Sequence, residues 1–475
     1  MSAPNGPTRR HHGRVTRALV AVSATIALVV GAFAGFAFAR YLDVQQVGKK
    51  DGFLDDAADP TPSAGAVPPP PPTGRCSEDP CNYLILGSDS RTGLTEEELE
   101  RFGTDKAIGG ENRADTIMLV HVDPTLEKTI ILSFPRDLWV DVPGHGFDKI
   151  NAAFEGGIEA GGGRLMAQTV ANLTGLRVDH VLYVDLVGFQ GIVDTLEGVE
   201  MCIPAYNADP ATGRIQDPLT GLDIEPGCQR LDGQQALAYV RTRHLPCDTI
   251  PDFARIGRQQ QFLRAVINQM LQPEKLIQAP TLIEPILDNM TRDNRFEVGD
   301  LIYLVNQLQG LTTGAAEFRS VPGTGGIENG LSVVRMDPSA RQIFEAIRDG
   351  KQITGVGETL LNTPPSEANI EIAAVDGGDP GEAADVLGVL LQGGFAADPA
   401  VASPADLGLK KRATSAIAFA PGHDAEASVV QSYFPQLPLL ESPSLEDHDV
   451  AVIVADDYEP PPTGGDAPTG ACPSA

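Results

Sequence analysis

Residues 82–87 read NYLILG, an apolar run that ends in glycine and is followed at once by the polar residues 88–91, SDSR. Two further short runs have the same character, TIMLV at 116–120 and TIILSF at 129–134. Continuous apolar runs of this length, bounded by polar residues or glycine, are typical of strands buried on both faces. We therefore expect these three segments to form the centre of a sheet.

Helical periodicity alternates with these strands. The spacing of apolar residues predicts helices over 164–174, 185–197, 233–240, 255–271 and 297–308. Strands that alternate with helices place the chain in the α/β class. We expect a mixed central sheet flanked by helices.

A second, smaller unit follows the Pro364-Pro365 pair. Segments 369–375 and 449–454 read as strands, and 381–391 reads as a helix. We expect a small C-terminal α/β domain here. After Tyr458 the chain returns to proline, glycine and threonine, a composition typical of a disordered tail.

The N-terminus carries a candidate membrane anchor. Residues 18–39 are uncharged and mostly apolar, and as a helix they span about 33 Å, enough to cross a bilayer. Arginines precede this run, so the positive-inside rule places residues 1–17 in the cytoplasm and the bulk of the chain outside. A cleaved signal peptide is the alternative, because Ala37-Phe38-Ala39 resembles a cleavage site. Both interpretations make the remaining chain extracytoplasmic.

Charge and cysteine content agree with that location. The 35 basic and 64 acidic residues give a formal charge of −29, which excludes nucleic acid as a partner because the phosphates would be repelled. The six cysteines suit an oxidising compartment, although sequence alone does not choose their pairing. We expect Cys202 to pair with Cys228 and Cys76 with Cys81. The cysteines lack the paired C-x-x-C spacing that would indicate a zinc site.

Seven arginines lie at the ends of predicted elements: Arg91, Arg113, Arg136, Arg241, Arg243, Arg255 and Arg258. Arg241 and Arg243 are two residues apart, which on an extended segment places both side chains on one side. Asp252, Arg255 and Gln259 share one face of the following helix. Guanidinium groups bind phosphate oxygens in pairs, so this set predicts a site for a polyanion such as a pyrophosphate. Ordinary surface ion pairing is the alternative.

Two carboxylates occupy strand ends beside these arginines. Asp89 follows the first apolar run, and Asp115 leads into the second. Mg²⁺ is commonly bound by one or two carboxylates together with phosphate oxygens, so the pair is a candidate magnesium site. The alternative is that both aspartates pair with neighbouring arginines or cap turns.

Six segments in this order resemble the LytR-CpsA-Psr (LCP) family: residues 82–91, 113–119, 133–137, 149–151, 239–244 and 252–260. Residues 369–456 resemble the small C-terminal domain attached to actinobacterial members of the family. The resemblance implies a membrane-anchored, Mg²⁺-dependent phosphotransferase that moves an anionic glycopolymer from a polyprenyl-pyrophosphate carrier to peptidoglycan. A pyrophosphatase side activity is expected with it. A non-catalytic envelope regulator that binds polyprenyl phosphate is the alternative.

The resemblance also implies roles for individual residues. Asp89 and Asp115 would hold Mg²⁺. The catalytic residues would be Arg113, Arg241, Arg243 and Asp252, with Asp252 acting either as a base or as a partner that orients arginines. The pyrophosphate would be bound by Arg136, Lys149, Arg255 and Gln259, and the pattern of arginines at element ends adds Arg91 and Arg258 to this set.

The expected organisation combines the anchor, the resemblance and the composition. It comprises a cytoplasmic tail at 1–17, a transmembrane helix at 18–39, a proline-rich linker at 40–75, an LCP-like catalytic domain at 76–330, a linker at 331–368, a small α/β domain at 369–456 and a disordered tail at 457–475.

Overall fold

The computed structural model describes residues 49–50, 76–88, 96, 113–157, 160–209, 211–248, 251–270, 273–308, 316–351, 367–378, 380–445 and 448–460. None of the helices in these ranges is both long enough and apolar enough to span a bilayer. The predicted cytoplasmic tail, the predicted anchor at 18–39, most of the predicted linker at 40–75 and the chain after residue 460 lie outside the described residues.

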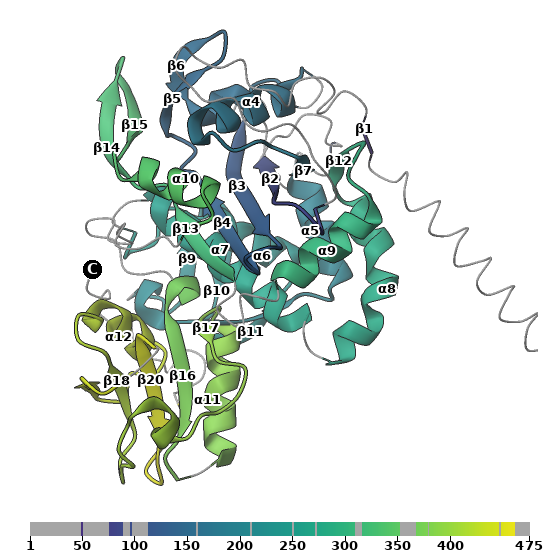
Figure 1. The fold of residues 1–475 in the computed structure, drawn as a ribbon. Coiled ribbons are helices and arrows are strands. Elements are labelled where there is room, and N and C mark those ends of the chain that lie inside the picture. Colours follow the sequence, from purple (N-terminus) through teal and green to yellow (C-terminus); the bar gives the residue numbers. More distant parts are fainter. Residues whose placement is uncertain are drawn as a thin grey trace, which may run out of the picture. The chain divides into compact units, whose positions relative to one another are not determined.

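A seven-stranded mixed sheet forms the centre of the first lobe, as expected (Figure 1). Its order is β1 (Lys49–Lys50), β12 (Thr291–Asp293), β7 (His180–Val184), β2 (Cys81–Ser88), β3 (Ala114–Asp123), β4 (Lys128–Ser133) and β13 (Ala316–Ser320). Strand β2 pairs antiparallel with β3 and parallel with β7. All three strands predicted from the apolar runs are confirmed, as β2, β3 and β4.

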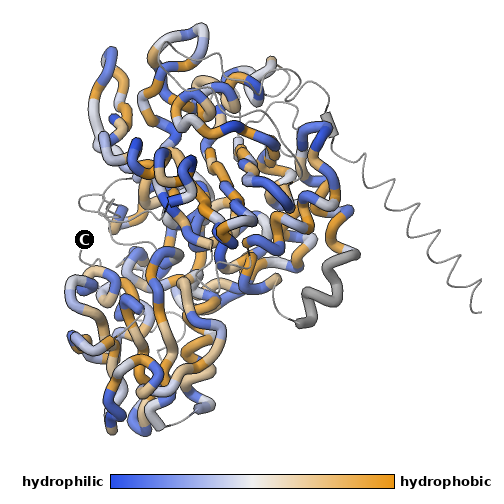
Figure 2. Tube along the Cα trace, viewed as in Figure 1, coloured by the Kyte–Doolittle hydropathy of each residue, from blue (hydrophilic) through white to orange (hydrophobic). Residues whose placement is uncertain are grey.

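The sheet is buried on both faces because its strands are apolar at successive positions. Leu84 and Leu86 of β2 face one core, and the residues that alternate with them, Tyr83 and Ile85, face the other. Strand β3 divides its side chains in the same way, with Leu119 in the first core and Met118 in the second. Figure 2 shows these strands as apolar segments of the tube.

The five predicted helices are confirmed: α4 (Gly162–Thr174), α5 (Leu186–Thr195), α6 (Gly233–Arg241), α7 (Pro251–Met270) and α9 (Val298–Leu308). Helix α7 begins at Pro251 rather than at residue 255, because proline suits the first position of a helix. Helix α4 covers the first face of the sheet, while α9 and part of α7 cover the second. A further helix, α8 (Pro273–Asp288), was not predicted.

Short antiparallel pairs complete the first lobe. They are β5 (Trp139–Val142) with β6 (Gly146–Lys149), β8 (Val199–Ile203) with β11 (Gly227–Leu231), β9 (Ile215–Asp217) with β10 (Leu222–Ile224), and β14 (Gly323–Glu328) with β15 (Leu331–Met336). Pairs β8–β11 and β9–β10 pack with α5, α6 and α7 in a separate apolar cluster.

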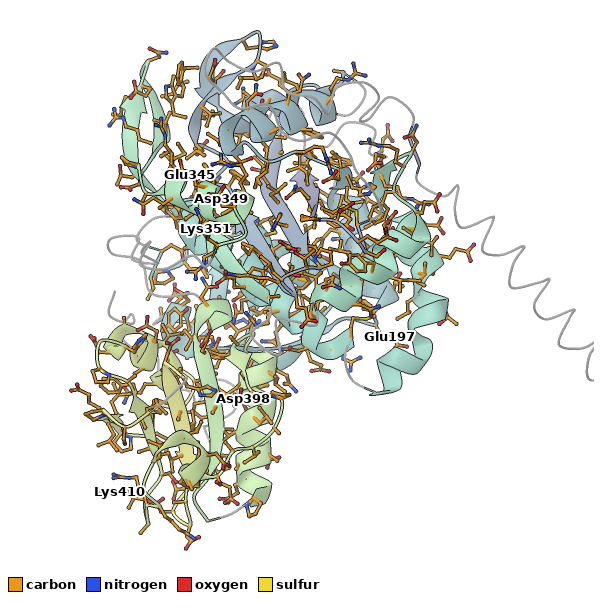
Figure 3. All side chains as sticks on the ribbon, viewed as in Figure 1. Glu197, Glu345, Asp349, Lys351, Asp398 and Lys410 are labelled. Atoms are coloured by element: carbon orange, nitrogen blue, oxygen red, sulfur yellow. A yellow bond between two sulfur atoms is a disulfide. The ribbon has the colours of Figure 1, made fainter. Side chains whose placement is uncertain are left out.

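The prediction of a linker at 331–368 is wrong for residues 331–348, which form a strand and a helix. Residues 331–336 form β15, and α10 (Ala340–Arg348) inserts Ile343, Phe344 and Ile347 into the first core. The physical reason is an apolar stripe at helical spacing, with charged residues on the other side of the helix. Figure 3 shows Glu345, Asp349 and Lys351 around this outer side and the end of the helix.

Residues 367–460 carry a second mixed sheet. Its order is β17 (Ala396–Ala397), β16 (Glu371–Asp376), β20 (Val450–Val454), β18 (Ala416–Phe419) and β19 (Leu439–Glu441). Helices α11 (Pro380–Gln392) and α12 (Asp424–Gln431) pack on one face. The two strands and the helix predicted here correspond to β16, β20 and α11.

Polar contacts join this C-terminal lobe to helix α7. The side-chain amide of Gln261 donates to the carbonyl oxygen of Gly393 at 2.7 Å and to the hydroxyl of Tyr433 at 2.9 Å. The amide of Asn268 donates to the carbonyl oxygen of Leu391 at 3.1 Å. The end of α11 and the turn after it therefore rest directly on α7.

Both expected disulfides are confirmed, Cys76 with Cys81 and Cys202 with Cys228. Cys247 is also disulfide-bonded. The bond between Cys202 and Cys228 joins β8 to β11 at directly opposite positions of the pair.

The close contact between Gly394, in the turn after α11, and Gln261 of α7 predicts that the stability of the protein depends on this glycine. Gly394 has φ +77°, and an added Cβ would lie 2.6 Å from Cγ and from the carbonyl oxygen of Gln261. Gly422 has φ +90° in the same lobe, with open space around it. Gly422→Ala should lower the free energy of unfolding by about 1–2 kcal/mol through backbone strain. Gly394→Ala should cost a further 1–3 kcal/mol or so, because the two lobes must separate to admit the methyl group.

Chemical denaturation of both variants checks this expectation. Equal losses of unfolding free energy would mean that Gly394 does not pack against α7.

Candidate active site

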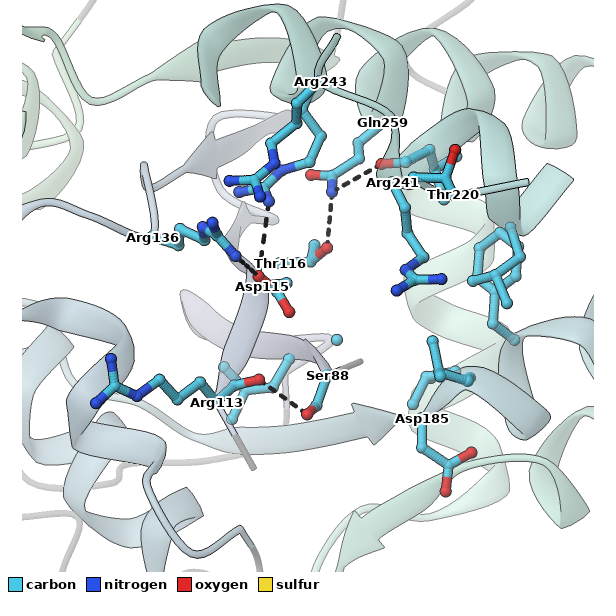
Figure 4. A pocket seen from close by; sticks show the side chains of 18 of the residues that line it. Ser88, Arg113, Asp115, Thr116, Arg136, Asp185, Thr220, Arg241, Arg243 and Gln259 are labelled. Carbon is cyan, nitrogen blue, oxygen red and sulfur yellow. Dashed lines mark hydrogen bonds and ion pairs between the residues drawn. The ribbon is translucent and has the colours of Figure 1, made fainter. Parts of the chain in front are cut away.

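A cavity of about 860 Å³ lies where β2 and β7 end and β3 begins. Helices α5, α6 and α7 form its other walls. The predicted site residues that line it are Arg113, Asp115, Arg136, Lys149, Arg241, Arg243, Arg255 and Gln259. Segments from distant parts of the sequence therefore meet at one end of the sheet (Figure 4).

Two carboxylates organise the guanidinium groups. Asp115 Oδ1 pairs with Arg136 Nη1 and lies 3.6 Å from Arg255 Nη1. Asp252 Oδ1 lies 3.4 Å from Arg255 Nη2, 3.5 Å from Arg243 Nη1 and 3.7 Å from Arg136 Nε. Figure 4 shows Arg136 directed toward Asp115.

The arginines that line the cavity carry donors that the described part of the chain does not satisfy. The Nε atoms of Arg113, Arg136 and Arg255 are buried and have no hydrogen-bond partner among the described residues. Burial lowers the pKa of Arg255 to about 10, an effect that Asp115 opposes and the nearby Arg136 adds to. Buried donors without acceptors are rare in proteins, so the cluster suits an anionic ligand with several oxygens.

Asp252 lies in the first turn of α7, at the start of the helix face that it was predicted to share with Arg255 and Gln259. Burial raises the pKa of this carboxyl, but Arg255, Arg136, a hydrogen bond with Asp137 and Arg243 together lower it below its usual value. A carboxylate with a lowered pKa is a weak proton acceptor. The geometry is that of a group that orients arginines.

Asp137 lines the cavity, and its surroundings raise its pKa, whereas those of Asp252 lower the pKa of that carboxyl. Burial and the neighbouring Asp252 raise its pKa, although Lys149 and Arg136 act against this. Lys149 Nζ lies 2.9 Å from Asp137 Oδ1. Lys149 therefore reaches the cavity as predicted, paired with a carboxylate.

Gln259 and Arg241 lie at the wall formed by α6 and α7. The side-chain amide of Gln259 donates to the hydroxyl of Thr116 at 2.8 Å, and this bond connects α7 to the beginning of β3. Arg241 ends α6 and reaches the cavity from that side, apart from Arg136 (Figure 4).

Arg113 occupies the opposite rim. Its Nη2 lies 3.5 Å from Glu155 Oε2, and its carbonyl oxygen accepts a hydrogen bond from the Ser88 hydroxyl. In Figure 4 its side chain extends away from Arg243. Arg113 thus lines the cavity without joining the central cluster.

Arg258 does not reach the cavity, so its predicted contact with pyrophosphate is wrong. Its Nη1 donates to Asp248 Oδ1 at 2.8 Å, and its Nη2 donates to Asp248 Oδ2 at 2.9 Å and to the carbonyl oxygen of Thr242 at 2.6 Å. Although Arg258 lies only three residues after Arg255 on α7, these bonds direct its side chain toward Asp248 and Thr242 instead of the cavity. Arg258 is a buried structural residue.

One wall of the cavity is apolar, which no single motif in the sequence predicted. The side chains that form it are Ile85, Met118, Val184, Leu186, Phe189, Ile192, Leu237, Val240, Phe262 and Leu263. They come from the sheet and from α5, α6 and α7. A charged cluster beside an apolar wall suits an amphipathic ligand.

The predicted metal ligands are only partly described. Asp115 faces the cavity, whereas Asp89 and the predicted pyrophosphate ligand Arg91 lie outside the described residues. Among the described residues, one group has metal-ligand spacing: Cys76, His180 and Asp300. It is not a metal site, because Cys76 is bonded to Cys81.

A profile of the LytR_cpsA_psr family matches residues 55–349. LcpB of Corynebacterium glutamicum is 41% identical over 241 residues, which are 51% of this chain and 54% of that protein. The polyisoprenyl-teichoic acid–peptidoglycan teichoic acid transferase TagU of Oceanobacillus iheyensis is 34% identical over 219 residues, which are 46% of this chain and 59% of that protein. This chain therefore matches little more than half the length of either relative.

Among solved structures, the crystal structure of TagT from Bacillus subtilis is similar with a TM-score of 0.45 and 23% identity. The similarity covers 61% of this chain and 98% of TagT.

The buried position of Arg258 makes a prediction that separates it from surface arginines. Arg258→Ala leaves the Asp248 carboxylate buried without its partner, so it should lower the free energy of unfolding by about 3–5 kcal/mol. Arg214 pairs with the exposed side chains of Asp223 and Glu225 at the surface, and Arg214→Ala should cost roughly 0–1 kcal/mol. Denaturant titration measures both. A loss for Arg258→Ala no larger than that for Arg214→Ala would contradict a structural role for Arg258.

Proposed function

The chain belongs to the LytR_cpsA_psr family, and on that premise we propose that it is a glycopolymer phosphotransferase. The proposed reaction moves an anionic glycopolymer from a polyprenyl-pyrophosphate carrier to peptidoglycan, with hydrolysis of the pyrophosphate as a side reaction. The observation that carries the proposal is one cavity that combines buried, unsatisfied guanidinium donors with an apolar wall. The name of the relative TagU supports the same class of reaction.

The guanidinium cluster is proposed to bind the pyrophosphate. Arg136, Arg243 and Arg255 present forked donors in a cavity of restricted solvent access, where their interaction with phosphate oxygens is stronger than in water. Asp115 and Asp252 hold these groups in place before the ligand arrives. Such preorganised charges stabilise the negative charge that develops on the leaving phosphate.

The apolar wall is proposed to bind the polyprenyl chain. Phe189 and Phe262 pack against each other with tilted rings, 5.3 Å between ring centroids, and they line the cavity together with Leu186 and Ile192. Burial of an isoprenoid chain against such residues contributes about 25 cal/mol per Å² of apolar surface. The membrane anchor proposed at 18–39 would keep the enzyme beside this lipid.

In the transfer step, the oxygen of a peptidoglycan hydroxyl forms a bond to the phosphorus that carries the glycopolymer. The bond from that phosphorus to the bridging oxygen breaks, and polyprenyl monophosphate leaves with that oxygen. Asp137 is proposed to accept the hydroxyl proton, because it lines the cavity and its pKa is raised by burial and by Asp252. With water in place of the hydroxyl, the same step is hydrolysis.

Magnesium is proposed as the cofactor. Asp115 would hold it together with Asp89, and the hydroxyl of Ser88, which also lines the cavity, is a hard oxygen atom of the kind that Mg²⁺ prefers. Bound there, Mg²⁺ would neutralise phosphate charge.

Release of phosphate from a polyprenyl pyrophosphate by the full-length protein tests the proposal. Arg241→Ala should lower the turnover by about 10²–10³-fold, as loss of one transition-state donor does. Its thermal stability should change little. Arg348→Ala removes an exposed arginine of α10 far from the cavity walls and serves as the control. A chelator should abolish turnover, and added Mg²⁺ should restore it.

Absence of turnover in the wild-type protein, together with tight binding of the lipid, would favour the non-catalytic regulator instead. Turnover that withstands the chelator would contradict the magnesium requirement alone.

A further inference from the structure

Thr242 separates the two arginines that reach the cavity from the end of α6, and it is fully buried. Its backbone amide donates to the carbonyl oxygen of Ala238 at 3.1 Å and so closes the helix. Its own backbone is extended, with φ −63° and ψ 146°. Arg241, the last residue of α6, and Arg243 line the cavity, whereas Thr242 between them is buried in the protein and does not.

The Thr242 hydroxyl donates to Oδ2 of Asp217, whose side chain is completely buried. The same oxygen accepts the backbone amide of Arg243 at 3.4 Å, and Asp217 Oδ1 accepts the amide of Leu219 at 3.0 Å. Asp217 ends β9, so this carboxylate links the β9–β10 hairpin to the arginine segment.

The backbone of Thr242 is held from the other side. Arg258 donates to its carbonyl oxygen at 2.6 Å while pairing with Asp248. Thr242 is therefore fixed through its hydroxyl by β9 and through its carbonyl group by α7. Both contacts are buried, where a hydrogen bond is stronger and a missing partner is costly.

The β9–β10 turn also forms part of the cavity. Pro218, Leu219 and Thr220 line it, and Leu219 is 76% exposed, which is unusual for a large apolar side chain at a cavity rim. Because Asp217 bonds to Leu219 and to Thr242 at once, the turn and the two arginines are parts of one rigid unit.

We propose that Thr242, held by Asp217, is a positioning residue that sets the direction of Arg241 and Arg243 toward the bound pyrophosphate. This inference rests on the proposed function for its ligand. Neither Thr242 nor Asp217 touches the reacting atoms. Their effect passes through the backbone that carries the arginines, and a small displacement of such groups lowers reaction rates steeply.

Thr242→Val tests the inference, since valine keeps the shape and lacks the hydroxyl. Asp217 retains the amides of Leu219 and Arg243 as donors, so the variant should fold. Thr242→Ser restores the hydroxyl and is the rescue variant. Thr174 provides the matched control: its buried hydroxyl donates to the carbonyl oxygen of Val170 at 2.8 Å in α4, away from the cavity.

The full-length variants are compared by calorimetric titration with inorganic pyrophosphate and by kcat and KM on a polyprenyl pyrophosphate. Thr242→Val should weaken pyrophosphate binding and lower kcat by about 10- to 100-fold. Thr242→Ser should recover most of both. Thr174→Val should bind pyrophosphate and turn over as the wild type does, whatever its thermal stability.

Two results would overturn the inference. One is unchanged binding and kcat in Thr242→Val, and the other is an equal loss in the valine and serine variants, which would assign the effect to packing. Failure of the proposed function has a different signature: wild-type protein that binds pyrophosphate but does not turn over the lipid. In that case the binding series alone decides the role of Thr242. Wild-type protein that binds no pyrophosphate would overturn both proposals.

Discussion

Mutual repulsion of guanidinium groups is the constraint around which the cavity is built. Arg136, Arg243 and Arg255 all lie within 3.7 Å of one oxygen of Asp252. Burial penalises each charge, and the pKa of Arg255 is lowered to about 10 as a result. Asp115 and Asp252 offset part of this cost, and the donors still unsatisfied favour a ligand with several anionic oxygens. The protein thus concentrates positive charge in a chain whose formal charge is −29.

The fold supplies the rigidity that such an arrangement needs. The sheet is buried on both faces, so the ends of β2, β3 and β7 are fixed relative to one another. One part of helix α7 carries Arg255 and Gln259 into the cavity, while Gln261 and Asn268, further along the helix, contact the C-terminal lobe. The second lobe is therefore continuous with the scaffold of the site. This contact gives it a structural part in holding α7.

The sequence predicted three of the seven strands of the central sheet, five helices, both described disulfides and eight of the described cavity residues, because each depends on local spacing or on a short motif. It failed where distant contacts decide the outcome. Arginine is a residue type that binds phosphate, yet Asp248 and Thr242 hold the side chain of Arg258 inside the protein. Thr242 and Asp217 gave no local signal, since their pairing joins separate elements. By contrast, α10 had a readable apolar stripe at helical spacing within the segment that was interpreted as a linker.

A crystal structure of the protein with a bound polyprenyl pyrophosphate would show whether the guanidinium cluster binds the diphosphate. We expect the diphosphate among Arg136, Arg243 and Arg255, with its oxygens accepting from the buried Nε atoms of Arg136 and Arg255. The isoprenoid chain should then lie along Phe189 and Phe262. Diphosphate bound elsewhere on the protein, or an isoprenoid chain directed away from these two rings, would contradict this expectation.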